Sequence, residues 1–139
     1  ELHDFQGARE RLKELESDAT SASATLLLEH IKLAEEIESL KQKLQADSGD
    51  ADAHFRMGNA YFQWHERYRS ASSKTHFVEA IEQYQETIRL APDLPEAHLN
   101  LGLAYLEQGD KNAAMEQYQA LQRLKSSLAD QLWAEINKR

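Results

Sequence analysis

Six histidines are the side chains of this sequence best suited to metal binding or acid–base catalysis. Residues 65–69 begin with His-Glu, as the zinc motif H-E-x-x-H does, but position 69 is an arginine and the second metal ligand is missing. Ser72, Ser73 and Lys74 place a hydroxyl next to a base, yet no glycine-rich nucleophile turn or oxyanion motif accompanies them. No glycine-rich phosphate-binding motif occurs either. The residue types and their spacing therefore predict no catalytic site, no metal and no cofactor.

Two of the histidines, His54 and His98, belong to a pattern that occurs twice. The pattern A-H-x-x-x-G-x-A-Y spans residues 53–61 and recurs 44 residues later. A second pattern, A-[IM]-E-Q-Y-Q, spans residues 80–85 and recurs 34 residues later, so the first copy holds ten additional residues (44 less 34). One unit has been duplicated. The equivalent positions of the two histidines favour a packing role for both over a catalytic one.

Each unit is predicted to be a pair of helices, which makes the fold all-α. Ala53, Met57 and Ala60 recur at helical spacing. Glycine is a poor helix former, so Gly58 and Gly102, which stand within predicted helices, indicate places where two helices approach closely. Proline and glycine mark the turns between segments. The predicted helices lie near 51–64, 77–90, 95–108 and 111–125.

The duplicated unit resembles a known repeat family. The residues that carry the resemblance in the second copy are Leu101, Gly102, Tyr105, Ala114, Tyr118 and Leu124, and in the first copy Met57, Gly58, Tyr61, Ala80, Tyr84, Leu90 and Pro92. They fall where the 34-residue tetratricopeptide repeat has its L-G-x-x-Y…A…F/Y pattern, and they cover residues 51–126. The resemblance implies an α-solenoid of tandem antiparallel helix pairs, whose first helices line a concave groove that holds a partner peptide.

The resemblance also implies which residues line that groove. They are Phe55, Asn59 and Phe62 from the first copy, with Arg56 near the edge, and Leu99, Asn100, Leu103 and Leu106 from the second copy. Asn59 and Asn100 match the asparagines that hold a peptide carboxylate in chaperone-binding members. The lysines of that clamp are missing, since Phe55 replaces one of them and Asp130 and Ala134 stand where later basic residues would be. We therefore expect an apolar groove for an amphipathic helix or peptide, and a binding scaffold rather than an enzyme.

The ten additional residues form an insertion near 64–76 with its own predicted role. Aromatic side chains next to arginine are enriched at protein interfaces. A second contact surface is accordingly predicted from Trp64, Arg67, Tyr68 and Arg69. The alternative is a lengthened helical hairpin that packs on itself, with residues 70–73 at its tip.

Residues 1–48 form a separate N-terminal segment with three open interpretations. Leu26, Leu33 and Leu40 alternate with His30, Ile37 and Leu44 in a heptad pattern that extends back to Leu2. Such a pattern predicts a coiled coil that pairs chains into a homo-oligomer, which is the alternative function for the whole protein. The same segment also aligns with the repeats, so residues 17–48 could pack as a degenerate third unit or fill the groove. Disorder is the third interpretation.

The domain bounds, charge and composition of the chain narrow the class of protein. Residues 49–139 are predicted to be the repeat domain, closed by a capping helix at 127–138. The net charge of −8 argues against nucleic-acid binding, and no apolar run is long enough to span a membrane. Cysteine is absent, so no disulfide forms. Because the sequence begins with Glu1, we expect a fragment. The full-length protein could be membrane-anchored or secreted, and the sequence leaves its compartment undetermined.

Overall fold

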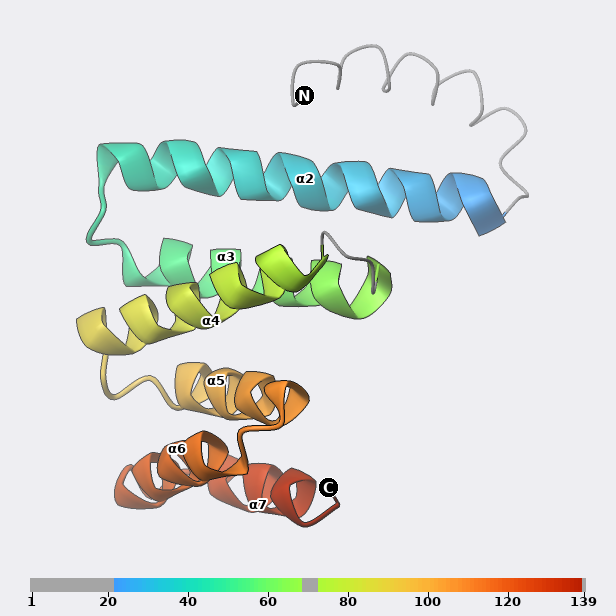
Figure 1. The fold of residues 1–139 in the computed structure, drawn as a ribbon. Coiled ribbons are helices and arrows are strands. Elements are labelled where there is room, and N and C mark those ends of the chain that lie inside the picture. The colour runs from blue at the N-terminus through green and yellow to red at the C-terminus, as the bar shows by residue number, and fades with distance from the viewer. Residues whose placement is uncertain (1–21, 69–72, 139) are drawn as a thin grey trace.

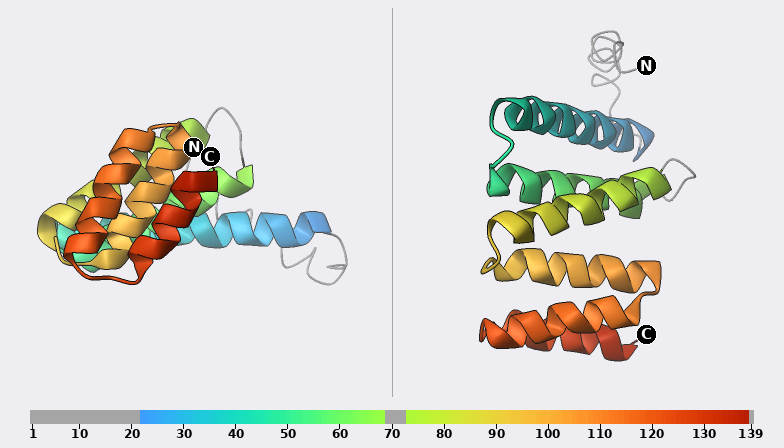
Figure 2. Two further views of the ribbon diagram at one scale, coloured as in Figure 1. Left: turned by 90° about the horizontal axis from the view of Figure 1, so that it is seen from below. Right: turned by 60° about the vertical axis from the view of Figure 1, so that its left-hand side comes forward.

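The structure is a computed structural model that describes residues 22–68 and 73–138. These residues form six helices and no strand, which confirms the all-α prediction. The helices are α2 (Ala22–Ala46), α3 (Ala51–Tyr68), α4 (Ser73–Leu90), α5 (Pro95–Gln108), α6 (Lys111–Arg123) and α7 (Leu128–Lys138). They follow one another down the molecule in chain order, as Figures 1 and 2 show. None of the described helices is long and apolar enough to cross a membrane.

Aspartate and glycine residues set the helix ends in the repeats. The carboxylate of Asp50 accepts a hydrogen bond from the backbone N–H of Ala53 at 2.9 Å, which caps the start of α3. Asp110 caps α6 in the same way, accepting from the N–H of Ala113 at 2.9 Å. Gly109 ends α5 with φ at 87°, a left-handed conformation that glycine adopts without steric cost. The turn between α5 and α6 therefore lies at Gly109 and Asp110, between two of the predicted helices.

Two clusters of buried residues hold the stack together. Helices α2, α3 and α4, together with one face of α5, enclose the first cluster, and α5, α6 and α7 enclose the second. The first cluster contains Leu33, Ile37, Leu40, Ala53, Met57, Ala60, Tyr61, Phe77, Ala80, Ile81, Tyr84, Leu101 and Ala104. The second contains Leu99, Leu106, Ala114, Leu121, Ala129, Leu132 and Ile136. Because α5 contributes to both, it joins the two repeats into one stack.

The repeated glycines lie at close helix contacts, as predicted. A Cβ atom placed on Gly58 would stand 2.7 Å from Cε1 of Tyr84 in α4. On Gly102 it would stand 2.6 Å from Cδ2 of Leu132 in α7. Both distances are far below carbon–carbon contact. The first glycine therefore closes a repeat on itself, whereas the second lets α7 pack against α5.

The insertion lengthens both helices of the first repeat. Helix α3 continues to Tyr68 and α4 begins at Ser73, so both exceed the ranges predicted from the repeat alone. At the inner ends of the inserted segment, Trp64 packs against the first core cluster and Phe77 belongs to it. These contacts explain why both helices continue into the insertion. The segment 69–72 lies outside the described residues, and so do Arg69 and most of the predicted tip.

Helix α2 packs on the first repeat. Leu33, Ile37 and Leu40, three residues of the predicted heptad, are buried in the same cluster as α3 and α4. Leu26 and Leu27 remain 53% and 44% exposed, near the end of α2 that reaches past the other helices in Figure 2. The part of the heptad between Leu2 and Ala19 lies outside the described residues. A coiled coil between chains thus stays a prediction, but much of the apolar stripe is already used within one chain.

Candidate functional site

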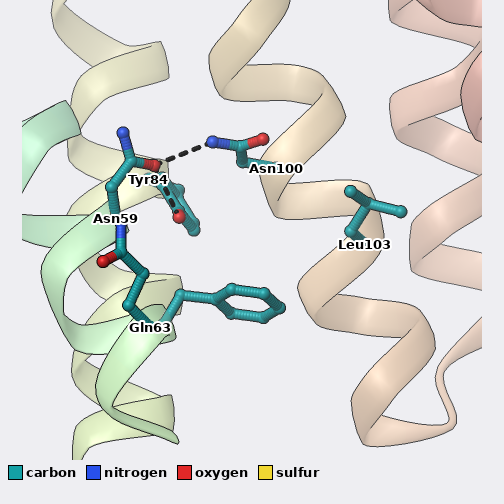
Figure 3. Close-up of a pocket in the computed structure, with 6 residues that line it drawn as sticks. Asn59, Gln63, Tyr84, Asn100 and Leu103 are labelled. Atoms are coloured by element: carbon teal, nitrogen blue, oxygen red, sulfur yellow. Dashed lines mark hydrogen bonds between the residues drawn. The ribbon is translucent and has the colours of Figure 1, made fainter. Parts of the chain in front are cut away.

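The two repeats meet along a hollow between their first helices, α3 and α5, with α4 behind it. This inter-repeat groove has a volume of about 210 Å³. It is lined by Asn59, Phe62, Gln63, Tyr84, Asn100 and Leu103. The structure thus brings together four of the residues predicted for the groove, two from each repeat (Figure 3).

A pair of hydrogen bonds crosses the groove from one repeat to the next. Oδ1 of Asn59 accepts from the hydroxyl of Tyr84 at 2.9 Å and from Nδ2 of Asn100 at 2.8 Å. Figure 3 shows Asn59 and Asn100 facing each other, with Tyr84 below the pair. These two bonds do not use Nδ2 of Asn59 or Oδ1 of Asn100. The groove therefore carries both an amide donor and an amide acceptor held at fixed positions.

The polarity of the groove differs from the prediction. Three of its six lining side chains are amides, and the phenol of Tyr84 adds a fourth polar group, so the groove is mixed rather than apolar. Burial raises the pKa of Tyr84, so the phenol stays neutral and donates its proton to Asn59. The repeat pattern did not point to Gln63, although it lies one helical turn after Asn59 on the same face of α3. That spacing was the signal that could have identified it.

Two leucines of α5 that were predicted for the groove lie elsewhere. Leu99 and Leu106 are only 8% and 5% exposed, because both are buried in the second core cluster with α6 and α7. The prediction that they line the groove is therefore corrected. They lie seven residues apart, on a face of α5 that the capping helix covers, and the repeat pattern alone does not reveal which face α7 takes.

Phe55, predicted to line the groove, and Arg56, predicted to lie near its edge, contact the neighbouring helices instead. The ring centroid of Phe55 lies 6.1 Å from that of Tyr84, so Phe55 packs half-buried against the first core cluster. Arg56 points toward α2 and forms an ion pair with Glu36, with 3.2 Å between Nη2 and Oε1. Neither side chain lines the inter-repeat groove, so the prediction that Phe55 does is corrected as well.

The aromatic residues of the insertion contact α2. The ring of His30 lies 4.3 Å from that of Trp64 and 4.8 Å from that of Tyr68, measured between centroids. Arg67 forms an ion pair with Glu29. The surface predicted from these residues is thus largely occupied by α2 of the same chain. The lengthened end of α3 provides the side chains on which the N-terminal half of α2 rests.

The repeated histidines make matching hydrogen bonds in the two units. Nδ1 of His54 lies 2.7 Å from Oε1 of Gln83, and Nδ1 of His98 lies 2.9 Å from Oε1 of Gln117. The other ring nitrogen contacts a backbone carbonyl oxygen of the preceding loop, at 3.1 Å and 2.9 Å respectively. Each histidine therefore ties the two helices of its unit to the loop before them. Within the described ranges, no three His, Asp or Glu side chains are grouped to hold a metal ion.

Comparison with protein families identifies the repeat. A model described as a TPR repeat matches residues 77–109, and one described as a tetratricopeptide repeat matches residues 95–127. Together they cover most of α4 and all of α5 and α6, which include the second repeat and one side of the inter-repeat groove. No curated protein matches the sequence.

Two solved structures are similar to this fold. The crystal structure of MamA superposes with a TM-score of 0.55 at 26% identity, over 84% of this chain and 66% of that one. A second structure, titled crystal structure of MamA protein, gives a TM-score of 0.53 at 27% identity, over 87% of this chain and 64% of that one. The chain thus spans just under two thirds of the length of each. The shared feature is a stack of helix pairs of the tetratricopeptide type.

Proposed function

Because the chain is a tetratricopeptide repeat protein, and this family provides scaffolds for protein–protein interaction, we propose that its inter-repeat groove binds a peptide segment of a partner protein. The observation that carries the proposal is the hydrogen-bonded pair of Asn59 and Asn100, one from each repeat, within an open hollow. A bond between the two first helices fixes the spacing of the amides before any ligand arrives. Such preorganisation reduces the entropy lost on binding.

The size and lining of the groove suit a peptide. Its volume of about 210 Å³ lies below the range of roughly 300–1,000 Å³ typical of small-molecule sites, and matches one or two side chains of a larger ligand. Phe62 and Leu103 offer apolar contacts for such a side chain. The amides of Asn59, Gln63 and Asn100 can exchange hydrogen bonds with its polar or backbone groups. An apolar anchor next to polar contacts is the usual composition of a peptide site.

The chemistry of the lining favours binding over catalysis. Its polar groups are amides and a phenol whose pKa is raised by burial. None of these groups exchanges protons readily near neutral pH, which general acid–base catalysis requires. We therefore infer a role in capturing a partner and no reaction at this site.

Helix α2 leaves the groove accessible. The described lining belongs to α3, α4 and α5 alone, while α2 and α5 lie on opposite sides of α3 in Figure 1. We therefore do not propose α2 as the occupant of the groove. An external peptide is the occupant that we propose.

The test uses peptides selected from a random displayed library on the immobilised chain. Fluorescence anisotropy then measures the affinity of one labelled peptide for the parent and for an Asn100→Ala, Leu103→Ser variant. We expect at least a tenfold loss, about 1.4 kcal/mol, because an anchor contact and a fixed amide are removed together. A control variant, Asn112→Ala with Leu27→Ser, alters exposed residues of the same types elsewhere and should bind as the parent does. Equal affinity of the groove variant and the control would rule out the groove as the site.

A further inference from the structure

A second cavity lies between α2 and α4, across α3, and we propose that it binds the guanidinium group of an arginine presented by a partner protein. This α2–α4 cavity has a volume of about 260 Å³. Its lining includes Ile37 and Glu38 of α2, Tyr61 and Trp64 of α3, and His76 and Glu79 of α4. It shares no lining residue with the inter-repeat groove, so the two sites can be filled together and the inference does not rest on the proposed function.

Three aromatic rings form one wall of the α2–α4 cavity. The ring of His76 lies 5.4 Å from that of Tyr61 and 4.9 Å from that of Trp64, measured between centroids. His76 of α4 thus contacts both of the other rings, which belong to α3. A cation near the face of tryptophan or tyrosine is attracted by the negative charge of the ring face. The wall therefore favours a cationic ligand over an anionic one.

Carboxylates on two helices strengthen that preference. Glu38 and Glu79 line the cavity from α2 and α4. The pKa of Tyr61 is raised to about 12, first by burial and then by the charges of Glu79 and Glu38, so the negative potential of both reaches the aromatic wall. Lys41, the one basic residue of the described lining, is exposed and offsets one of these charges. The two glutamates and Lys41 together carry a net charge of −1, and Nδ1 of His76 lies 3.5 Å from Oε2 of Glu79.

Arginine fits this combination of groups better than the other cations of proteins. Its guanidinium is planar and stacks on an aromatic face, while its five N–H donors can reach two carboxylates at once. The aliphatic stem can lie on Ile37, as the stems of long basic side chains commonly lie on apolar surface. The volume is again below that of small-molecule sites and matches a single long side chain.

The site also gives a role to the segment outside the two repeats. Ile37 and Glu38 come from α2, so the repeats alone supply only the aromatic wall and one carboxylate. Packing of α2 on α3 therefore completes the site. A partner that carries an arginine would be held on a different part of the molecule from the peptide in the inter-repeat groove.

The test is an NMR titration of the full chain with acetyl-Gly-Gly-Arg-Gly-Gly-amide, and separately with the same peptide carrying neutral citrulline. We expect saturable shifts of the Trp64 indole N–H and the Ile37 methyl groups with the arginine peptide, and none with the citrulline peptide. Glu38→Gln and Glu79→Gln should each weaken binding about threefold or more. Glu82→Gln removes an exposed carboxylate of α4 outside the cavity and should leave binding unchanged.

Three results would overturn the inference. One is an equal response to the citrulline peptide, and another is equal weakening by Glu82→Gln, which would mean diffuse attraction to an acidic surface. The third is the absence of any saturable shift at Trp64. All three glutamine substitutions preserve side-chain shape, and circular dichroism checks that the variants keep the fold. The groove variant could lose its selected peptide while the arginine peptide gives no saturable shift. In that case the proposed function stands and this inference does not.

Discussion

At the scale of single residues, Tyr84 joins the packing of the first repeat to the polarity of the groove. Its ring lies where a side chain on Gly58 would be, and its hydroxyl donates to Asn59. The ring is almost fully buried, so its position is fixed by its neighbours on all sides. A change at the glycine should therefore disturb both the stability of the repeat and the position of the groove amide.

Replacing Gly58 with alanine tests this coupling. The new Cβ would stand 2.7 and 2.8 Å from two ring atoms of Tyr84, and the buried ring cannot move away cheaply. Overpacking costs about 1–3 kcal/mol, and the higher helix propensity of alanine returns about 1 kcal/mol. We expect a net loss of about 1 kcal/mol in the free energy of unfolding, measured with urea. Gly49→Ala is the control, since its Cβ would only touch an exposed carboxylate at 3.4 Å, and a loss as large there would refute the explanation.

The buried tyrosines predict how stability depends on alkaline pH. The pKa of Tyr61 is raised to about 12, mainly by burial, above the ordinary value of 10. Between these values the unfolded chain has lost a proton that the folded chain keeps, so the free energy of unfolding decreases as pH rises from 10 to 12. Denaturant titrations across this range should show the decrease, with a smaller slope in Tyr61→Phe. An identical slope in that variant would contradict the assignment.

The histidines and glycines show how far single residues could be interpreted from the sequence. The glycine contacts were predictable, since a glycine within a helix needs a packing reason. The packing role of His54 and His98 was predictable from their equivalent positions, but their partners Gln83 and Gln117 were not, because those lie on the second helix of each unit. Hydrogen bonds between helices depend on how the helices rotate, which a pattern of residue types does not fix.

At the scale of helices, the sequence predicted the bounds of the second repeat and of the capping helix well, and the contacts of the added elements poorly. Helices α5 and α6 match the predicted segments closely, because glycine, proline and aspartate mark their ends. The role of the insertion was harder to predict. Trp64 and Tyr68 are residue types common at protein interfaces, but they contact α2, which is distant in sequence. Leu99 and Leu106 do not line the groove for a similar reason, because α7 covers the face of α5 on which they lie. Contacts between elements decide which of two apolar faces stays open.

Leu40 provides a test of whether α2 belongs to the fold. It is 3% exposed and lies in the first core cluster, so Leu40→Ala should lower the free energy of unfolding by about 2–5 kcal/mol. Leu27→Ala removes a leucine of the same helix that is 44% exposed, and should change the stability little. Urea denaturation measures both, and sedimentation measures their mass. A change in oligomeric state without loss of stability in Leu40→Ala would favour the coiled-coil alternative.

At the scale of the whole molecule, two repeats are enclosed between α2 and α7, and each end covers a different core cluster. About three units are usually needed for a stable array of repeats, and here the flanking helices take the place of the missing neighbours. Among the described residues, one hollow of this short stack lies between the repeats and another lies between α2 and α4. The repeat pattern predicted the first hollow, but not the second, which depends on where α2 packs.

The central claim is that the inter-repeat groove holds a partner peptide, and site-specific photo-crosslinking tests it most directly. A benzoylphenylalanine at position 103 replaces a groove leucine, and one at position 27 replaces an exposed leucine of α2. Each protein is irradiated with the same library-selected peptide, and the covalent adduct is measured by mass spectrometry. We predict an adduct from position 103 that excess unlabelled peptide abolishes, and none from position 27. Adducts from position 27 alone, or from neither position while the peptide still binds, would contradict the claim.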